Sequence, residues 1–388
     1  MLTSKVMSIL GIRPDWIKMK SVISRLDRGD LQHVLVHTGQ HYSYNLDRIF
    51  FEQLEIRKPD YHLGVGSGSD GEQTAKIIER SEKVILKEQP DIVLVFGDSN
   101  SSQAAIAAAK ANFKAARIEA GMRAYDWRMP EEKNKRMVDH ICRFLFAYTR
   151  WQEQNLLKEN VKPYRISVVG NPTVDVINTF KTKASANSIS SDLGLSRGDY
   201  FLVTAHRSEN VDDKNSLEKI LRGLELVLQK HGKPVVWPLY PRTKDRIRRF
   251  NLSIPKGVRV LEPLGFIEFL HLEMNALCLI SDSGTVQEEG CILGVPCVVI
   301  RLTTERPETV VVGSSIIAGL EPSDMLQSIE TFLGENRKWK HPYGDGHTAE
   351  RVVEVLKGYD PKPVVEEMVK FEATDEDARV CFSPRLFG

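Results

Sequence analysis

The sequence predicts an α/β fold made of two Rossmann-like, doubly wound domains that face each other across a cleft. The first observation is that short apolar, β-branched runs alternate with longer segments of helical periodicity, which is typical of βαβ units and buried parallel sheets. The second is the length of 388 residues, which suits two or three domains. The third is that the βα pattern starts again after about residue 198.

The expected elements follow this alternation along the whole chain. The expected strands are Val6–Leu10, His33–His37, Ile92–Phe96, Ile166–Val169, Phe201–Thr204, Val235–Trp237, Cys278–Ser281 and Cys297–Ile300. The expected helices are Gly71–Lys87, Ser101–Ala111, Glu131–Cys142, Asn215–Lys230 and Val286–Leu293. Thr182–Asp199 is rich in Ser, Gly and Asn and is interpreted as a linker or mobile loop. We place the domains at residues 1–172 and 173–358, followed by a charged tail, 359–388, that either packs on the first domain or stays partly loose.

Composition excludes several classes of protein. Lys and Arg total 53 against 52 Asp and Glu, and this balance argues against nucleic-acid and polybasic membrane partners. No apolar run approaches the roughly 18 residues that cross a bilayer, and the N-terminus lacks the features of a signal peptide. The five cysteines are irregularly spaced without a CxxC pair, which fits reduced thiols and disfavours a zinc site. We therefore expect a cytoplasmic protein without a metal.

Polar residues gather where the strands of the first half end, which is the edge at which such sheets bind ligands. After the first strand, Arg13 and the helix N-terminus that follows it favour a phosphate, with Lys18 one turn further on. Asp98 follows the strand Ile92–Phe96, and Glu119 and Glu131 belong to a stretch dense in acids and arginines. The alternatives are an ordinary capped turn, a helix N-cap cluster and a solvated charged loop.

The second half repeats this pattern. His206 lies at a strand end beside Arg207 and Glu209, although a lone histidine there is more often structural. A later strand opens into a helix through hydroxyl and amide donors that suit an anion, and a carboxylate inside that helix, Glu289, could accept both ribose hydroxyls. The donors are Ser283, Gly284 and Thr285. Together these loops indicate a nucleotide-type ligand flanked by carboxylates and one histidine.

Several motifs in order and spacing make the sequence similar to the non-hydrolysing UDP-N-acetylglucosamine 2-epimerases over about residues 5–357. They read GIRPDWIKM, HTGQHY, GDSNS, EAGMRAYDWRMPEEKNKR, VVGNPTVD, TAHRSENV, SDSGTVQEE, LGVPCVVIR, TTERPE and YGDGHTAERV. The resemblance implies a GT-B-like pair of Rossmann-type halves, a UDP-sugar substrate, a homodimer, and no metal or nicotinamide cofactor.

The resemblance also implies residue roles. The catalytic acids would be Asp98, Glu119 and Glu131, and His206 would be catalytic or contact the diphosphate. The expected UDP ligands are Arg13 for the diphosphate, Ser283, Gly284 and Thr285 for a phosphate, and Glu289 for the ribose. From the same loops we add Lys18, Arg207, Glu209, Arg301 and Arg306 as UDP-binding candidates.

The implied reaction constrains the chemistry. The hydrogen at C2 of a 2-acetamido sugar is not α to a carbonyl, so without a nicotinamide the remaining route breaks the bond from C1 to the diphosphate. We expect anti elimination of UDP to a 2-acetamidoglycal, followed by re-addition from the other face. Asp98 and Glu131 are the candidates for acid and base at C2, with Glu119 tuning one of them.

Some positions depart from the family pattern. Asp15 replaces a common Glu, Gly284-Thr285 replaces a Gly pair, Leu302 stands where Asp is frequent, and Tyr240-Pro241-Arg242 replaces a His-Pro segment. The Gly-Thr form is also similar to the branch that epimerises 6-deoxy sugars in the UDP-N-acetyl-L-fucosamine pathway, so a UDP-2-acetamido-2,6-dideoxyhexose is the alternative substrate. A hydrolysing relative, a glycosyltransferase and a non-catalytic nucleotide-sugar sensor are the remaining alternatives.

A second, allosteric substrate site occurs in some bacterial members of the family. Gln40 and His41 match part of that site, whereas Leu63–Gln73 lacks the arginine expected in it. The sequence therefore does not predict activation of the familiar kind.

Overall fold

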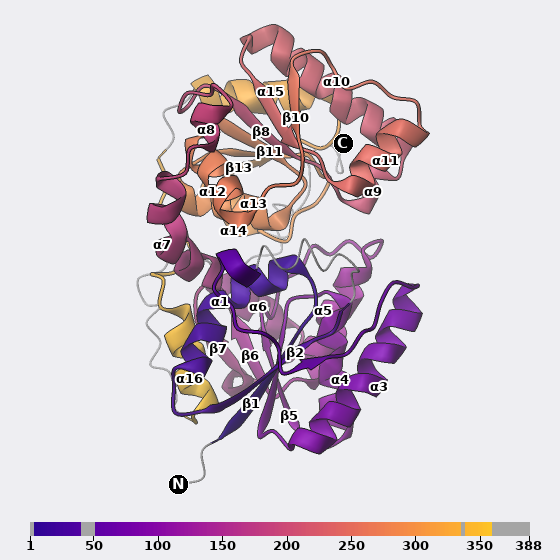
Figure 1. Ribbon diagram of the computed structural model, residues 1–388, viewed down its shortest axis with the longest axis vertical. Coiled ribbons are helices and arrows are strands. Elements are labelled where there is room, and N and C mark those ends of the chain that lie inside the picture. Colours follow the sequence, from indigo (N-terminus) through magenta and orange to yellow (C-terminus); the bar gives the residue numbers. More distant parts are fainter. Residues whose placement is uncertain (1–3, 40–50, 335–337, 359–388) are drawn as a thin grey trace. The chain divides into compact units, whose positions relative to one another are not determined.

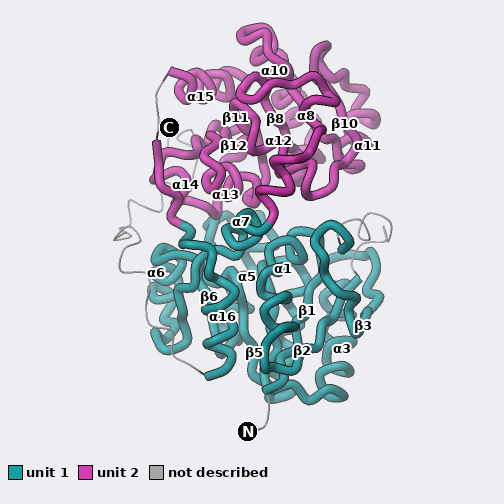
Figure 2. The backbone as a smooth tube through the Cα atoms, turned by 60° about the vertical axis from the view of Figure 1, so that its left-hand side comes forward, with its two compact units in different colours: residues 1–179, 343–373 teal, residues 180–342, 374–388 magenta. Residues whose placement is uncertain are grey.

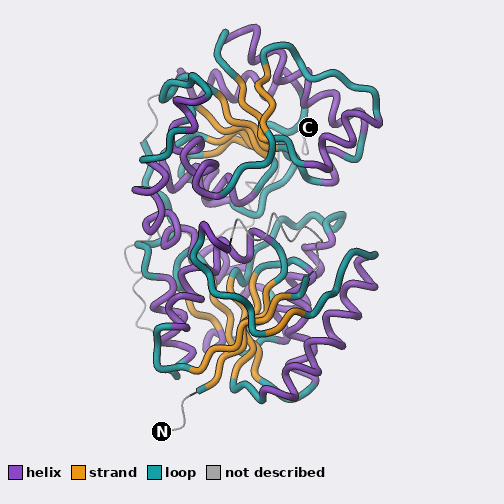
Figure 3. The backbone as a smooth tube through the Cα atoms, in the orientation of Figure 1, coloured by secondary structure: helices purple, strands orange, loops and turns teal. Residues whose placement is uncertain are grey.

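A computed structural model describes residues 4–39, 51–334 and 338–358 of the chain (Figure 1). The chain divides into two compact units, shown in different colours in Figure 2. Of the described residues, those up to 179 and from 343 onwards form unit 1, and those from 180 to 342 form unit 2. Each unit is a parallel sheet with helices around it, as Figure 3 shows. The predicted α/β class, with a doubly wound parallel sheet in each of two units, is confirmed.

Unit 1 contains a seven-stranded sheet in the order β3-β2-β1-β4-β5-β6-β7. Its strands are β1 (Lys5–Leu10), β2 (Gln32–His37), β3 (Tyr61–His62), β4 (Ile92–Phe96), β5 (Lys114–Ile118), β6 (Phe144–Ala147) and β7 (Ile166–Val168). Its helices are α1 (Arg13–Asp27), α3 (Asp70–Glu88), α4 (Ala104–Lys110), α5 (Pro130–Ile141), α6 (Arg150–Lys158) and α16 (Thr348–Leu356), with short 3₁₀ turns at Asn100–Gln103 and Pro163–Arg165. The strand order reverses between β1 and β4, so the loops that follow these two strands are expected to carry a ligand site.

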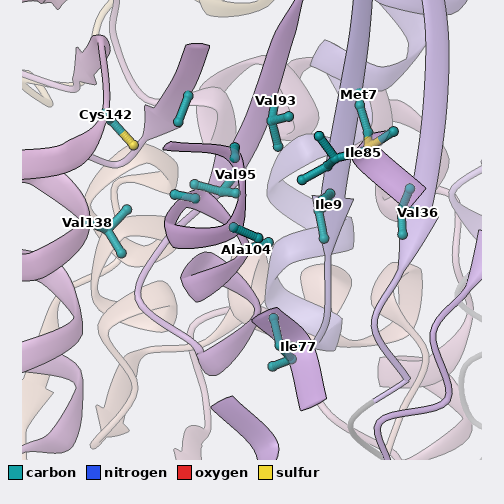
Figure 4. Close-up of a cluster of buried hydrophobic side chains, with 14 of the residues drawn as sticks. Met7, Ile9, Val36, Ile77, Ile85, Val93, Val95, Ala104, Val138 and Cys142 are labelled. Atoms are coloured by element: carbon teal, nitrogen blue, oxygen red, sulfur yellow. The ribbon is translucent and has the colours of Figure 1, made fainter. Parts of the chain in front are cut away.

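The core of unit 1 explains why its strands read as continuous apolar runs. Met7, Ile9, Val93 and Val95 from the central strands pack against apolar residues of α3, α4 and α5, as Figure 4 shows. Helices cover the sheet on both faces, so successive side chains of a strand are buried whichever way they point.

Unit 2 contains a six-stranded parallel sheet in the order β10-β9-β8-β11-β12-β13. Its strands are β8 (Phe201–Thr204), β9 (Val235–Pro238), β10 (Val258–Leu261), β11 (Cys278–Ser281), β12 (Cys297–Val299) and β13 (Ser315–Ile317). Its helices are α8 (Ile189–Asp192), α9 (Ser208–Val211), α10 (Lys214–His231), α11 (Pro241–Arg249), α12 (Phe266–Asn275), α13 (Gly284–Leu293), α14 (Pro307–Val311) and α15 (Pro322–Gly334). The strand order reverses between β8 and β11, which places the expected site of unit 2 after these strands.

Alternate residues of the unit 2 strands enter two separate apolar clusters. Val203 and Ile280 belong to one cluster, whereas Leu202 and Leu279 belong to the other. This is the two-residue period of a strand that is buried on both faces.

The predicted strands Ile92–Phe96, Phe201–Thr204 and Cys278–Ser281 coincide with β4, β8 and β11. The expected linker Thr182–Asp199 is partly wrong. Helix α7 (Pro172–Ser185) continues into it and α8 lies within it, because Ile189, Leu193 and Leu195 pack on an apolar cluster of unit 2.

The division of the chain differs from the boundary placed at 172/173. It falls inside α7, and residues 343–358 belong to unit 1. Helix α16 packs on α1, and the Asp175 carboxylate of α7 accepts hydrogen bonds from the backbone N–H groups of Thr348 and Ala349. The expected tail, 359–388, lies outside the described residues, as do Gln40 and His41.

Two negative findings concern the described parts of the chain. None of their helices is long and apolar enough to cross a membrane. They contain no group of three or more His, Cys, Asp or Glu side chains that could hold a metal ion.

Candidate active site

The turn from β1 into α1 is closed by its own aspartate. Asp15 Oδ2 accepts hydrogen bonds from the backbone N–H of Gly11 at 3.1 Å and of Ile12 at 3.2 Å. The sequence predicted that N–H groups of this turn would be free for an anion, and these two are not. Arg13, half-buried at the first position of α1, is the cationic side chain that this turn presents.

Asp15 also joins this turn to the loop that follows β4. The hydroxyls of Ser99 and Ser101 donate to the same Oδ2 atom at 3.2 and 3.1 Å. Burial raises the pKa of Asp15 to about 7, although its hydrogen bonds with Ile12, Gly11 and Ser101 act against the rise, and the nearby Asp98 adds to it. One buried carboxyl thus holds together the loops of Arg13 and Asp98.

Asp98 is a partly exposed carboxylate that pairs with a buried lysine. Its side chain is 28% exposed, and Oδ2 lies 3.2 Å from the ammonium of Lys135, which is almost fully buried on α5. Asn134 donates to the backbone carbonyl of Asp98 at 3.0 Å. A carboxylate that is held by a buried lysine and is also partly exposed is suited to exchanging a proton with a ligand.

Glu119 is buried and strained. It follows β5 with a φ of 71°, and its carboxylate accepts from the Lys18 ammonium at 3.1 Å and from the Tyr148 hydroxyl at 3.5 Å. Lys18 itself is buried beside the rings of Phe96 and Tyr148. The structure therefore pairs Lys18, expected from the sequence to bind UDP, with a predicted catalytic acid.

Gly97 makes room for the Glu119 carboxylate. Its φ of 59° lies in the left-handed region, and a Cβ there would stand 3.0 Å from Glu119 Oε2. The carbonyl of Gly97 accepts from Arg117, which is buried and bound to Asp139. Both the space beside Glu119 and the shape of the Asp98 loop depend on this glycine.

Glu131 lies in the first turn of α5 and is half-buried. Its neighbour Glu132 is fully buried and accepts from the backbone N–H of Ala124 at 3.0 Å. Arg136 lies 3.2 Å from the same carboxylate. Glu132 therefore fixes the start of the helix, whereas Glu131 is the more accessible acid of the two.

In unit 2 a buried aspartate organises the loop after β8. Asp282 Oδ2 accepts from the backbone N–H groups of His206 at 2.9 Å and Arg207 at 3.0 Å, and from the Asn210 amide at 3.1 Å. The His206 side chain is 40% exposed, but its Nδ1 atom is buried 3.5 Å from Asp282 Oδ1. Desolvation lowers the pKa of His206 below its usual 6.5, with Asp282 acting in the opposite direction.

The turn from β11 into α13 has the form of an anion site. Ser283 is the N-cap and accepts from the backbone N–H of Val286, and Gly284 and Thr285 begin the helix. A Cβ on Gly284 would stand 3.3 Å from Arg306 Cζ, so the glycine lets this guanidinium approach the turn. The helix N-terminus and the guanidinium both favour a phosphate.

Arginines surround one buried glutamate close to this turn. Arg207, Arg301 and Arg306 lie 3.6, 3.5 and 3.3 Å from Glu305 Oε2. The exposed Glu209 lies 3.7 Å from Arg301, and the buried Glu288 pairs with Arg306. Burial, followed by the charge of Arg207, lowers the pKa of Arg301. The predicted UDP-binding arginines of unit 2 therefore form one cluster.

Several organising residues escaped the sequence analysis. Lys135 and Asp282 lie inside the motifs EEKNKR and SDSG, but the motifs do not reveal that they are buried. Asp15 was recognised as a departure from the family and not as the link between two loops. Their partners lie up to 86 residues away in the chain, as for Ser101 and Asp15, which a local pattern does not show.

One doubly wound unit carries carboxylates that are paired with buried lysines, and the other carries an anion-binding turn and clustered arginines. These features define a nucleotide-sugar enzyme of the Rossmann-like α/β class. The sequence model of the family described as UDP-N-acetylglucosamine 2-epimerase matches residues 24–357. The chain belongs to this family, whose members are isomerases. The resemblance inferred from the motifs is confirmed.

Individual relatives agree. The chain is 43% identical to the UDP-N-acetylglucosamine 2-epimerase of Methanocaldococcus jannaschii, over 91% of this chain and 98% of that protein. It is 39% identical to the UDP-2,3-diacetamido-2,3-dideoxy-D-glucuronate 2-epimerase of Pseudomonas aeruginosa, over 91% and 99%. The crystal structure of the M. jannaschii enzyme in complex with UDP-GlcNAc and UDP matches with a TM-score of 0.87 at 42% identity, covering 92% of this chain and 100% of that one.

Proposed function

We propose that this enzyme interconverts UDP-N-acetylglucosamine and UDP-N-acetylmannosamine by inverting C2 of the sugar. The observation that carries the proposal is the match along nearly the whole chain to an epimerase crystallised with UDP-GlcNAc and UDP. The relative at 43% identity bears the same substrate in its name, which favours this sugar over the 6-deoxy alternative.

Unit 2 binds the UDP part. Ser283, Gly284 and Thr285 offer donors at the start of α13, and Arg306 stands beside Gly284. These groups bind the diphosphate, and His206 approaches it from the loop after β8. The Glu289 carboxylate, on α13, accepts hydrogen bonds from the ribose hydroxyls.

Unit 1 supplies the proton chemistry. A carboxylate takes the proton from C2 while the bond between C1 and the diphosphate oxygen breaks, and the electron pair of that bond leaves with UDP. A second acid then returns a proton to C2 from the opposite face, and the diphosphate oxygen re-forms its bond to C1. Asp98 and Glu131 are the acid and base, and Glu119, held by Lys18, tunes one of them.

The positive groups of the enzyme stabilise the charge that develops on the leaving diphosphate. The contributing groups are Arg13 at the first turn of α1, His206, the start of α13 and the Arg306 guanidinium. We further propose that the enzyme works as a homodimer in the cytoplasm. This is tested by light scattering of the purified chain and by fractionation of cells that express it.

The reaction is tested in deuterated water. We expect deuterium at C2 in both the product and the recovered UDP-N-acetylglucosamine, because the proton on the carboxylate exchanges with solvent. The 6-deoxy counterparts are compared in parallel, and release of free UDP is measured. Epimer without label at C2 would exclude the elimination route, and stoichiometric release of UDP and sugar would indicate a hydrolase.

A further inference from the structure

Behind Glu289 lies a second glutamate to which the sequence analysis gave no role. Glu273 is on α12, which packs against α13, the helix that carries Glu289. Glu273 is 1% exposed and Glu289 is 5% exposed. Two acidic side chains are therefore buried next to each other in the UDP-binding unit.

The Glu273 carboxyl lacks a hydrogen-bond donor among the N–H and O–H groups of the described residues. Both of its carboxyl oxygens are buried. Its neighbours Tyr200 and Cys297 belong to an apolar cluster, and the hydroxyl of Tyr200 donates to the backbone carbonyl of Leu272 instead. A carboxylate buried without a donor is expensive, so the state of this group needs an explanation.

The Glu289 carboxyl is the polar group beside it. Two ionised carboxylates have no proton to share, but one protonated and one ionised carboxyl form a strong O–H···O⁻ hydrogen bond. Burial, together with the charge of Glu289, raises the pKa of Glu273 well above its usual 4.5. The proton belongs on Glu273 because this group lies deeper and touches apolar neighbours.

We propose that Glu273 is a positioning residue for the nucleotide site: it is protonated at neutral pH, donates its O–H to Glu289 and orients the Glu289 carboxylate toward the ribose hydroxyls. The inference rests on the proposed function, in which Glu289 receives the ribose. The charge stays on Glu289, where a hydroxyl donor of the ligand gains most from it.

The binding test uses titration calorimetry on the full chain with UDP and with 2′-deoxy-UDP. The variants are Glu273→Gln, which keeps a donor of the same shape, and Glu273→Leu, which removes it. Glu268→Gln on the same helix is the matched control. We expect the unchanged enzyme to prefer UDP, and we expect this preference to persist in Glu273→Gln and in the control.

In Glu273→Leu we expect the affinity for UDP to fall about tenfold, the scale of a hydrogen bond that involves a charged group. The affinity for 2′-deoxy-UDP should fall much less, because that ligand gives Glu289 one hydroxyl fewer. A loss of folding would lower both affinities together, so the ratio of the two separates positioning from a structural effect.

Infrared difference spectroscopy reports the proton directly. The unchanged enzyme at neutral pH should show the carbonyl band of a protonated carboxylic acid that is absent from Glu273→Gln and present in Glu268→Gln. This measurement needs no Glu273→Leu protein, so it decides the matter even if that variant does not fold.

The outcomes separate the two proposals. An unchanged UDP preference in Glu273→Leu, or the absence of a band that depends on Glu273, overturns the role of Glu273 and leaves the epimerase proposal standing. Failure of the unchanged enzyme to bind UDP overturns the proposed function itself. Equal affinity of the unchanged enzyme for both nucleotides removes the ribose role of Glu289 and with it the inference.

Discussion

The two units solve the same structural problem with opposite chemistry. In each, a buried aspartate ties together loops at the point where the strand order reverses: Asp15 joins the loops after β1 and β4, and Asp282 joins those after β8 and β11. Around Asp15 stand further carboxylates, Asp98 and Glu119, each paired with a buried lysine. Around Asp282 stand a histidine and clustered arginines.

This difference teaches how one architecture serves two tasks. Clustered acids with a single cation each favour proton transfer, because neighbouring charges set the protonation state of each group. Arginines beside a helix N-terminus favour a diphosphate, because they supply a fixed positive potential. The division predicts that changes in unit 1 should act on turnover and changes in unit 2 on nucleotide affinity.

The largest expected effect tests unit 1. Asp98→Asn keeps the shape of the side chain and removes its ability to exchange a proton. Turnover should fall at least about a hundredfold, the scale of one acid or base group. The UDP affinity measured by calorimetry should stay within about threefold, because UDP binding is assigned to unit 2.

Glu79→Gln, which removes an exposed ion pair with Lys83 on α3, is the control and should leave both quantities unchanged. Unchanged turnover in Asp98→Asn would exclude Asp98 as the acid or base of the reaction. If it lost UDP binding in proportion to turnover, the division of tasks between the units would be wrong.

The second prediction tests the aspartate of unit 2. Asp282→Ala leaves the N–H groups of His206 and Arg207 and the amide of Asn210 without their acceptor. We expect the free energy of unfolding to drop by about 3 kcal/mol in urea titrations, together with weaker UDP binding. Asp212→Ala removes surface ion pairs with Arg242 and Arg246 and should cost about 1 kcal/mol. Equal costs for the two variants would argue against an organising role for Asp282.

The third prediction concerns the aspartate of unit 1 and pH. The pKa of Asp15 is about 7 in the folded chain against 3.8 for an unperturbed group, so the folded state holds this proton more tightly. Its contribution to stability is therefore complete below about pH 4 and is lost as pH rises to about 7, by up to a few kcal/mol. Asp15→Asn cannot ionise and should not show this loss.

The measurement is the difference in unfolding free energy between the unchanged chain and Asp15→Asn, taken across pH 4 to 7. A difference is needed because His37, whose pKa burial lowers to about 4, contributes the opposite slope in both proteins. A difference that stayed constant with pH would show that Asp15 ionises normally despite its burial.

The fold could be predicted because its signals are local. Continuous apolar runs marked the central strands β4, β8 and β11, where burial on both faces leaves little choice of residue. The predicted strands did not include β3, β5, β6, β10 or β13. Tyr61–His62 is two residues long, β13 is three, and β5 and β10 have exposed members. Residues 343–358, which include α16, were assigned to the second domain because the contacts of α16 with α1 join distant parts of the chain, which the sequence does not show.

The sequence predicts which loops carry the candidate residues but not how these residues pair. Strand ends and motif order led to Asp98, Glu119 and His206. That Lys18 pairs with Glu119, and that Lys135 pairs with Asp98, depends on which helix faces which loop. Sequence spacing does not encode this, since Lys18 and Glu119 are 101 residues apart.

The smallest predicted effect separates backbone strain from a catalytic role. Gly97 and Gly194 have almost the same φ, 59° and 60°, so alanine at either position costs about 1 kcal/mol of stability. A Cβ at Gly194 meets nothing within 4 Å, whereas a Cβ at Gly97 meets Glu119 Oε2 at 3.0 Å. Gly97→Ala should therefore also displace the Glu119 carboxylate and lower turnover about tenfold, a displacement effect smaller than removal of an acid. Thermal unfolding and initial rates of the two variants test this prediction. Equal turnover in both variants would show that the position of the Glu119 carboxylate does not govern the proton transfer assigned to unit 1.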